Sequence, residues 1–258
     1  MTDIHSYYLE LSKALIFSTE KRERIDISIE YFKQKIWGQF QDRLVEVVVF
    51  GSYSRDTIII EDDEADVDIV VIYKTREVQP DTYLKQIKSF CEDTYNRSTI
   101  YQDHPTIVID MEHIKFEIVP SIYVSPGVVK IPAPRSKELK WVHTNPKDLI
   151  TKVQAKDKNN KNLILPVIRI LKYWNTLNDR PFSSFQIERA VVDKIYTCST
   201  VKQYFSIAIS AVEAIASNDL QKKSMRKLRE KLKRLYILET NNFHEYIEQE
   251  LNSFLPFP

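Results

Sequence analysis

The chain has 258 residues, of which 43% are hydrophobic and 28% charged, the ordinary composition of a folded globular protein. Its 37 Lys and Arg against 36 Asp and Glu give a net charge of +1, which excludes a protein that packages nucleic acid through a global basic field. Cys91 and Cys198 have no metal-binding spacing, so we expect free thiols and no disulfide scaffold. No long uncharged apolar stretch and no signal-peptide pattern are present, and we therefore expect a cytoplasmic protein without a membrane-embedded part.

Helical and strand patterns alternate in the first half of the chain, which favours an α+β fold. Helical periodicity over residues 3–43 breaks near Ser18 and predicts two N-terminal helices or one long kinked helix. The following segments predict, in order, a strand, a short helix, a strand, a helix and a two-strand hairpin. These segments are 45–50, from about 53, 66–73, 80–95, 106–111 and 114–119. We expect a mixed sheet of four to five strands flanked by helices.

The second half predicts a helical lobe. Residues 125–146 hold four prolines and no regular period, so we expect an irregular crossover there. Glu188 is expected to close a capping box on Ser184 or a neighbouring residue. The predicted helices are 145–157, 160–178, one opened by Ser183 and Ser184, 202–217, 220–238 and 241–254. The predicted domains are N-terminal helices packing on both lobes (1–43), a sheet core (44–124), a crossover (125–145) and a helical lobe (146–258).

The segment from Val48 to Asp68, VVFGSYSRDTIIIEDDEADVD, combines two features that suit phosphate chemistry. Asp66 and Asp68 are two positions apart on a strand, so their side chains share a face and can hold one pair of divalent cations. Gly51 and Ser52 lie where a strand gives way to a helix, whose N-terminal N–H groups and dipole suit a triphosphate. The chain has only 3 Gly, so a Gly-Ser pair in this turn is informative.

A third carboxylate would complete a nucleotidyl-transfer site. Two metal ions about 3.5–4 Å apart, held by three carboxylates, can promote in-line attack of a hydroxyl on an α-phosphate. Glu117 in the strand KFEIVP is the candidate, and Asp110 in the adjacent strand competes for the role. An isolated Asp-x-Asp is usually a solvated surface pair, but the Gly-Ser turn upstream and Glu117 downstream favour a metal site.

The combined motifs resemble the polymerase-β-like nucleotidyltransferases. The pattern is GS-x-x-R-x-T, then D-x-D, then an acidic residue in a strand that ends in Val-Pro. The likeness is greatest to the CD-NTase branch, which is related to oligoadenylate synthases and cyclic GMP-AMP synthase and includes bacterial enzymes of antiphage signalling. In the helical half, ILKYWN and SSFQIE are similar to the family's lysine-bearing helix and its Ser-aromatic-x-x-Glu helix start. The resemblance covers roughly residues 25–200.

This resemblance implies roles for the residues of the first half. Ser52 and the Gly51 backbone would hold the β- and γ-phosphates of the substrate. Asp66 and Asp68 would bind two Mg²⁺ ions, for which Mn²⁺ could substitute. Glu117 would bind the metal that activates the acceptor hydroxyl, although many relatives have Asp at that position.

The resemblance also assigns residues of the helical half. Lys172 and Ser184 would contact the triphosphate, and Phe185 would stack on the donor base. A lysine on an amphipathic helix is otherwise ordinarily solvent-facing, and that reading of Lys172 stays open. Asp56 follows Arg55 where the family commonly has Gly, and because a non-Gly residue disfavours a positive φ, we expect the loop to differ there.

The implied activity is Mg-dependent synthesis of a cyclic or linear oligonucleotide second messenger from NTPs, ATP among them, with release of pyrophosphate, in antiviral defence. Transfer of a nucleotide onto a tRNA 3′ end or a protein side chain is the alternative, and an inactive nucleotide-binding module is a third reading. Residues 222–234 (KKSMRKLREKLKR) carry eight basic residues and one acid on a helix. That helix is either a solvated face or a site for RNA or a regulatory polyanion. A regulatory or effector protein is a further candidate partner.

Overall fold

The computed structural model describes residues 3–60, 62, 65–74, 78–103, 105–133 and 140–258. The chain folds into two compact units. The helical unit comprises Met1–Ile16, Thr57–Asp63 and Lys152–Pro258, and the sheet unit comprises Phe17–Asp56 and Glu64–Thr151. Each unit combines stretches that are far apart in the sequence. The predicted division into four consecutive domains (1–43, 44–124, 125–145 and 146–258) is a different kind of division and stays a prediction.

The sheet unit contains one mixed sheet, whose described strands number seven. Its helices are α2 (Thr19–Phe40), α3 (Gly51–Ser54) and α4 (Pro80–Thr94). Its strands are β1 (Leu44–Phe50), β2 (Asp66–Tyr73), β3 (Thr99–Asp103), β4 (Thr106–Asp110), β5 (Lys115–Ser125), β6 (Val128–Pro132) and β7 (Trp141–Thr144). The strand order is β1-β2-β5-β4-β3, with β6 beside β5 and β7 beside β6. Only the β2–β5 pairing is parallel among these described strands.

The predicted α+β class and the hairpin of β4 and β5 are confirmed, but the sheet is wider than the four to five strands expected. Strands β6 and β7 lie in the segment expected to be an irregular crossover, so that expectation is wrong for them; residues 134–139 of the segment lie outside the described residues. Pro132 is the last residue of β6, a position where a missing N–H is tolerated. Pro132 therefore marks the end of β6 and does not prevent the strand from forming.

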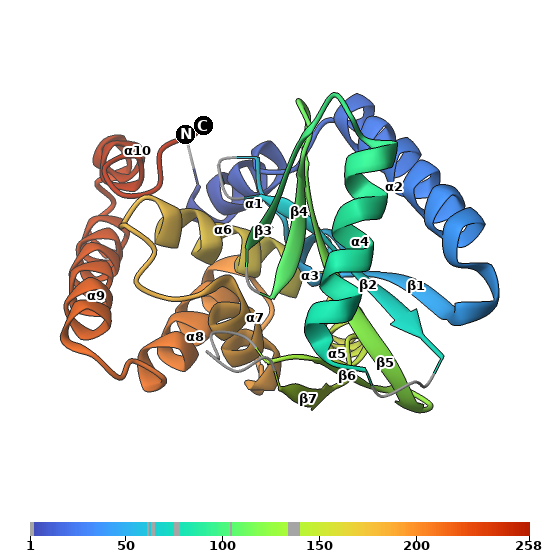
Figure 1. Cartoon of the computed structure of the whole chain (residues 1–258). Coiled ribbons are helices and arrows are strands. Elements are labelled where there is room, and N and C mark those ends of the chain that lie inside the picture. The colour runs from blue at the N-terminus through green and yellow to red at the C-terminus, as the bar shows by residue number, and fades with distance from the viewer. Residues whose placement is uncertain (1–2, 61, 63–64, 75–77, 104, 134–139) are drawn as a thin grey trace. The chain divides into compact units, whose positions relative to one another are not determined.

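The two faces of β2 have different surroundings. Val67 lies opposite Phe116 of the parallel strand β5, and both are fully buried. The Phe116 ring contacts Phe32 of α2 at 6.1 Å between centroids, and Phe32 contacts Phe90 of α4 at 6.0 Å. Helices α2 and α4 therefore cover this face, as Figure 1 shows. Because side chains alternate along a strand, Asp66 and Asp68 project from the opposite face.

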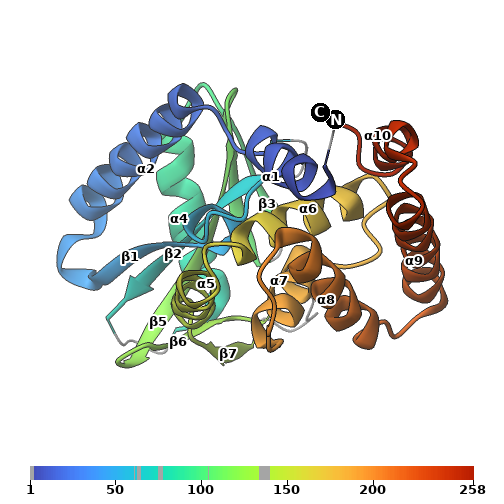
Figure 2. The same ribbon diagram turned by 180° about the vertical axis from the view of Figure 1, so that it is seen from behind.

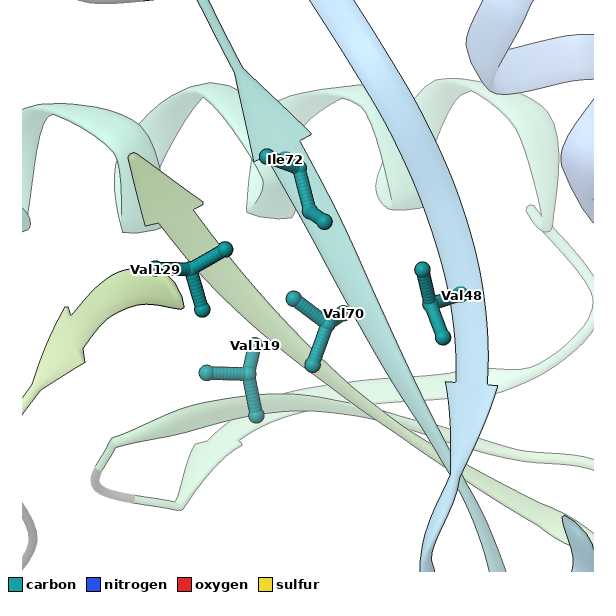
Figure 3. Packing of buried hydrophobic residues seen from close by; sticks show 5 residues of the cluster. All are labelled: Val48, Val70, Ile72, Val119 and Val129. Carbon is teal, nitrogen blue, oxygen red and sulfur yellow. The ribbon is translucent and has the colours of Figure 1, made fainter. Parts of the chain in front are cut away.

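The same face of the sheet also carries an apolar cluster, whose buried members are shown in Figure 3. The cluster draws on strands β1, β2, β5 and β6, and its buried members are Val48, Val70, Ile72, Val119 and Val129. Val70 follows Asp68 by two positions on β2, and Val119 follows Glu117 by two positions on β5. A one-residue slip of either strand would expose these valines and turn the carboxylates to the other face. Burial of the cluster thus fixes the register that places the acids.

The helical unit is built from helices that precede and follow the sheet unit in the amino-acid sequence. They are α1 (Ile4–Ala14), most of α5 (Asp148–Asn159), α6 (Ile164–Thr176), α7 (Ser184–Asp193), α8 (Val201–Ala214), α9 (Asp219–Thr240) and α10 (His244–Asn252). Helix α1 packs on α6 and α8, and α9 packs on α8 and α10 (Figure 2). Among the described residues, no helix has both the length and the apolar character needed to span a bilayer.

Candidate active site

The structure brings together the three predicted acidic residues. One carboxylate oxygen from each of Asp66, Asp68 and Glu117 lies within 4.8 Å of the other two. The parallel pairing of β2 and β5 places Asp68 directly opposite Glu117, which accounts for the convergence. The competing Asp110 is on β4, which lies one strand further from β2, and it is paired with Lys115 of β5. It does not belong to this group of described carboxylates. Strand order therefore favours Glu117 as the third acid.

The electrostatics of the group suit a divalent cation. Burial raises the pKa of the Glu117 carboxyl, and Asp103 raises it further, whereas hydrogen bonding with Asp66 and the charge of Lys115 act in the opposite direction. Three carboxylates this close repel one another when ionised, and oxygen ligands are those that Mg²⁺ and similar hard cations prefer. The donor set therefore fits a divalent metal held by these three side chains.

Gly51 lies directly against one of these acids. It adopts φ +72°, and a Cβ placed on it would lie 1.6 Å from the Asp68 Oδ2 atom. Both the left-handed backbone and the close approach therefore require a residue without a side chain at this position. Gly51 opens α3, and the half-buried Ser52 follows it. The predicted phosphate-binding turn and the metal-binding carboxylate are thus adjacent, while the phosphate contacts themselves stay a prediction.

The turn after α3 corrects one expectation. Asp56 adopts φ +58°, the left-handed conformation that we expected its side chain to prevent. Asp is among the few residues that tolerate this region. Its carboxylate also makes an ion pair with Arg22 of α2. The turn therefore has a positive φ at position 56, although Asp stands there in place of the Gly that is common in the family.

Lys172 is buried, which corrects the solvent-facing reading. Its side chain is 3% exposed, and its Nζ donates to the Thr57 carbonyl at 2.9 Å. The Thr57 hydroxyl donates to Glu188 Oε1 at 2.7 Å, and Lys172 Nζ lies 3.8 Å from the same Glu188 oxygen. Sequence reasoning did not predict that Thr57 and Glu188 contact each other or Lys172. Buried polar groups need hydrogen-bond partners, and this requirement is the signal that could have predicted the contacts among Thr57, Lys172 and Glu188.

The start of α7 corrects a third expectation. The capping box is formed by Ser183 and Gln186, whose side chains bond each other's backbone N–H, and Glu188 takes no part in it. Ser184 is half-buried as the first residue of α7, and Phe185 is 53% exposed. Both residues and Lys172 belong to the helical unit, whereas the acidic group belongs to the sheet unit. Their contacts with the substrate stay a prediction.

We expect the Lys172–Glu188 pair to matter for folding. Glu188→Ala should lower the free energy of unfolding by about 3–5 kcal/mol, because it leaves a buried ammonium without its carboxylate. The double variant Lys172→Met/Glu188→Leu should lose less than the sum of the losses in Lys172→Met and in Glu188→Leu, which with the unchanged protein complete a double-mutant cycle. Urea denaturation of the four proteins measures the coupling. Additive losses would contradict a direct interaction, and unchanged stability would contradict the burial of the pair.

Comparisons with known proteins agree with this geometry. The family model of the Second Messenger Oligonucleotide or Dinucleotide Synthetase (SMODS) domain matches residues 1–159, more than half of the chain. The structure is similar to that of the CD-NTase CdnG of Bradyrhizobium diazoefficiens in complex with GTP, with a TM-score of 0.77 and 11% identity over 99% of this chain and 96% of that chain. It is also similar to the cyclic AMP-GMP synthase DncV of Vibrio cholerae, with a TM-score of 0.63 and 12% identity over 81% and 68% of the chains.

A third solved structure is CdnC of E. coli MS115-1 with ATP, at a TM-score of 0.67 and 15% identity over 81% of this chain and 72% of that chain. CdnC has also been solved in a complex with HORMA-deltaN. In sequence, the chain is 25% identical over 195 residues to the CCA-adding enzyme of Pyrobaculum aerophilum. The match covers 74% of this chain and 45% of the enzyme, so the chain spans less than half the length of that relative.

The structural similarities confirm the predicted fold, a nucleotidyltransferase core with a C-terminal helical lobe. The family match agrees with the motifs from Gly51 to Glu117, all of which lie within the matched residues. It also confirms the predicted enzyme class, nucleotidyltransferase. The chain belongs to the Second Messenger Oligonucleotide or Dinucleotide Synthetase domain family.

Proposed function

We propose that the protein joins NTPs, ATP among them, into a cyclic or linear oligonucleotide second messenger and releases pyrophosphate. The observation that carries this proposal is the convergence of Asp66, Asp68 and Glu117 beside the Gly51 turn in a member of the SMODS family. Similarity to the cyclic AMP-GMP synthase of Vibrio cholerae supports the type of product. We also propose a cytoplasmic location and a role in antiviral defence.

Each side chain has a proposed task in the reaction. Asp66 and Asp68 would together hold two Mg²⁺ ions, with Mn²⁺ as a substitute, and Glu117 would complete the site on the acceptor side. When bound, the ions neutralise charge on the triphosphate and lower the pKa of the attacking hydroxyl. The Gly51 backbone and Ser52 would orient the β- and γ-phosphates in line with that hydroxyl.

Residues of the helical unit would act on the donor nucleotide. Lys172 and Ser184 would bind its triphosphate. The exposed ring of Phe185 would stack on the base, an interaction of about 1–3 kcal/mol that any base can make. The complex of CdnC with HORMA-deltaN supports a regulatory or effector protein as a partner. RNA or a regulatory polyanion at residues 222–234 is a further proposed partner.

Product analysis tests the proposal. The protein is incubated with each α-³²P-labelled NTP, with all four NTPs together, and with Mg²⁺ or Mn²⁺. We expect a small, phosphatase-resistant labelled product whose mass identifies its bases and linkage, with one pyrophosphate released for each bond formed. Absence of such a product in every condition, including addition of candidate polyanions, would reject second-messenger synthesis.

Transfer to an RNA 3′ end is the second candidate, because the CCA-adding enzyme of Pyrobaculum aerophilum matches 195 residues of the chain. The same incubation with added tRNA discriminates between the two functions. Label that lengthens the RNA on a denaturing gel, in place of a small product, would favour the second candidate. Label that remains on the protein after denaturation would favour transfer onto a side chain.

A further inference from the structure

Helix α9 of the helical unit buries one side and exposes a basic one. Its apolar residues Met225, Leu228 and Leu235 are at most 2% exposed, and the helix packs on α8 and α10. Figures 1 and 2 both show α10 beside α9. The side of α9 away from these contacts carries six exposed basic residues, which we call the basic face: Lys222, Lys223, Arg226, Lys227, Lys233 and Arg234.

The basic face is not neutralised by neighbouring carboxylates. The helix has two further basic residues that are already used: Arg229 binds Glu213 at 2.8 Å, and Lys231 lies 3.2 Å from Glu250. The six residues of the basic face, by contrast, make no ion pair within the described part of the chain, and Glu230 is the one acid among them. At 1.5 Å per residue, the face extends over about 18 Å. It therefore forms a dense local cationic strip on a protein whose net charge is only +1.

The flanks of this strip offer places for planar rings. A cavity of about 330 Å³ opens beside Lys227. Its walls combine aromatic and aliphatic side chains with amides: Trp174, Leu177, Asn178, Asn252 and Phe254. On α9 itself, Tyr236 is 62% exposed and lies one turn beyond Lys233. Both features suit an unpaired base, which has an apolar face for stacking and an edge for hydrogen bonds.

We propose that the basic face of α9 binds a single-stranded nucleic acid. The backbone phosphates would follow the six basic side chains, and unpaired bases would stack on Tyr236 and enter the cavity beside Lys227. A membrane surface fits less well, because Met225, Leu228 and Leu235 are buried against the protein and the exposed apolar side chains of α9 are confined to its two ends, at Leu220, Tyr236 and Ile237. A duplex fits less well too, because its stacked bases cannot reach either ring site. The interaction needs no residue of the acidic group and is independent of the proposed synthesis.

Fluorescence anisotropy with a labelled 20-nucleotide RNA of mixed sequence tests the proposal in the absence of NTPs. The same sequence as single-stranded DNA, the RNA duplex and vesicles containing phosphatidylserine are the comparison ligands. We expect both single strands to bind more tightly than the duplex, and the vesicles not to bind. The RNA and DNA arms show whether the 2′-hydroxyl contributes. No binding of either strand at 0.1 M salt, or equal binding of the duplex or vesicles, would overturn the proposal.

Matched variants separate the basic face from general charge. Lys223→Gln/Lys227→Gln/Arg234→Gln should weaken single-strand binding on the order of 10²-fold at 0.1 M salt and reduce the salt slope by about 2. The control Lys13→Gln/Lys35→Gln/Lys85→Gln removes the same charge from exposed positions elsewhere and should change affinity less than twofold. Tyr236→Ala should weaken binding by about five- to hundredfold. Equal weakening by the control, or an unchanged affinity of both α9 variants, would contradict the assignment.

Discussion

Asp68→Asn is expected to reduce turnover by on the order of 10³-fold or more, since a bound metal ion contributes several kcal/mol of transition-state stabilisation. The amide keeps the size of the side chain but removes the negative charge from one of three carboxylates whose oxygens lie within 4.8 Å. Initial rates with NTPs, normalised to folded protein, measure the effect. Turnover within tenfold of the unchanged protein would contradict the metal-binding role of Asp68.

Thermal unfolding distinguishes a metal-binding role from a structural one. In EDTA, Asp68→Asn should unfold at the same or a higher temperature, because it relieves repulsion among the carboxylates. Mg²⁺ should raise the Tm of the unchanged protein by mass action and have much less effect on the variant. Asp110→Asn is the matched control: this acid lies in the neighbouring strand outside the group, and both turnover and the Mg²⁺ effect should persist. If Asp110→Asn lost as much turnover and as much of the Mg²⁺ effect as Asp68→Asn, the choice of Glu117 over Asp110 as the third acid would be wrong.

Gly51→Ala is expected to reduce turnover by at least about 10²-fold, comparable with loss of a catalytic donor. The added methyl group would lie 1.6 Å from Asp68 Oδ2, so either the carboxylate or the turn must move. The backbone at φ +72° adds a cost of about 1–2 kcal/mol for a residue with a side chain. Steady-state kinetics with urea denaturation on the same preparations measure the two effects separately.

Gly127→Ala provides the control for the backbone part of this effect. Gly127 has a similar φ of +76°, but its nearest neighbour is the flexible amide of Asn145 at 3.3 Å. We therefore expect a comparable loss of stability from strain and a turnover within a few fold of the unchanged protein. If Gly51→Ala lost no more activity than Gly127→Ala, the contact with Asp68 would have no role in the reaction.

Local patterns in the sequence predicted the elements of the site correctly. The alternation of DVDIVVIY predicted a strand over residues 66–73, which is the range of β2, and it placed both aspartates on one face. The rarity of glycine pointed to the turn at Gly51, where the structure has a positive φ. These properties depend on neighbours within a few residues, through strand alternation and the allowed backbone angles, so they can be read without a fold.

Predictions that depended on remote neighbours were less accurate. Strands β6 and β7 were missed because prolines suggested a crossover, although β6 pairs with β5 and β7 pairs with β6. Glu188 was assigned to a local cap, whereas its observed partner Thr57 is 131 residues away. Asp56 was expected to avoid a positive φ, but the ion pair with Arg22 accompanies that conformation. For β6, β7 and Glu188, contacts with distant parts of the chain outweighed the local signal, whereas Asp56 itself tolerates a positive φ.

The sequence by itself determined that two aspartates share a strand face below a glycine turn, because strand periodicity and glycine's conformational range are local properties. Only the tertiary structure decided that Glu117, and not Asp110, joins them. That choice follows from the placement of β5 directly beside β2, with Asp68 opposite Glu117. Strand order arises from burial of the aromatic residues under α2 and α4 on one face and of the valine cluster on the other, and such burial depends on the whole chain.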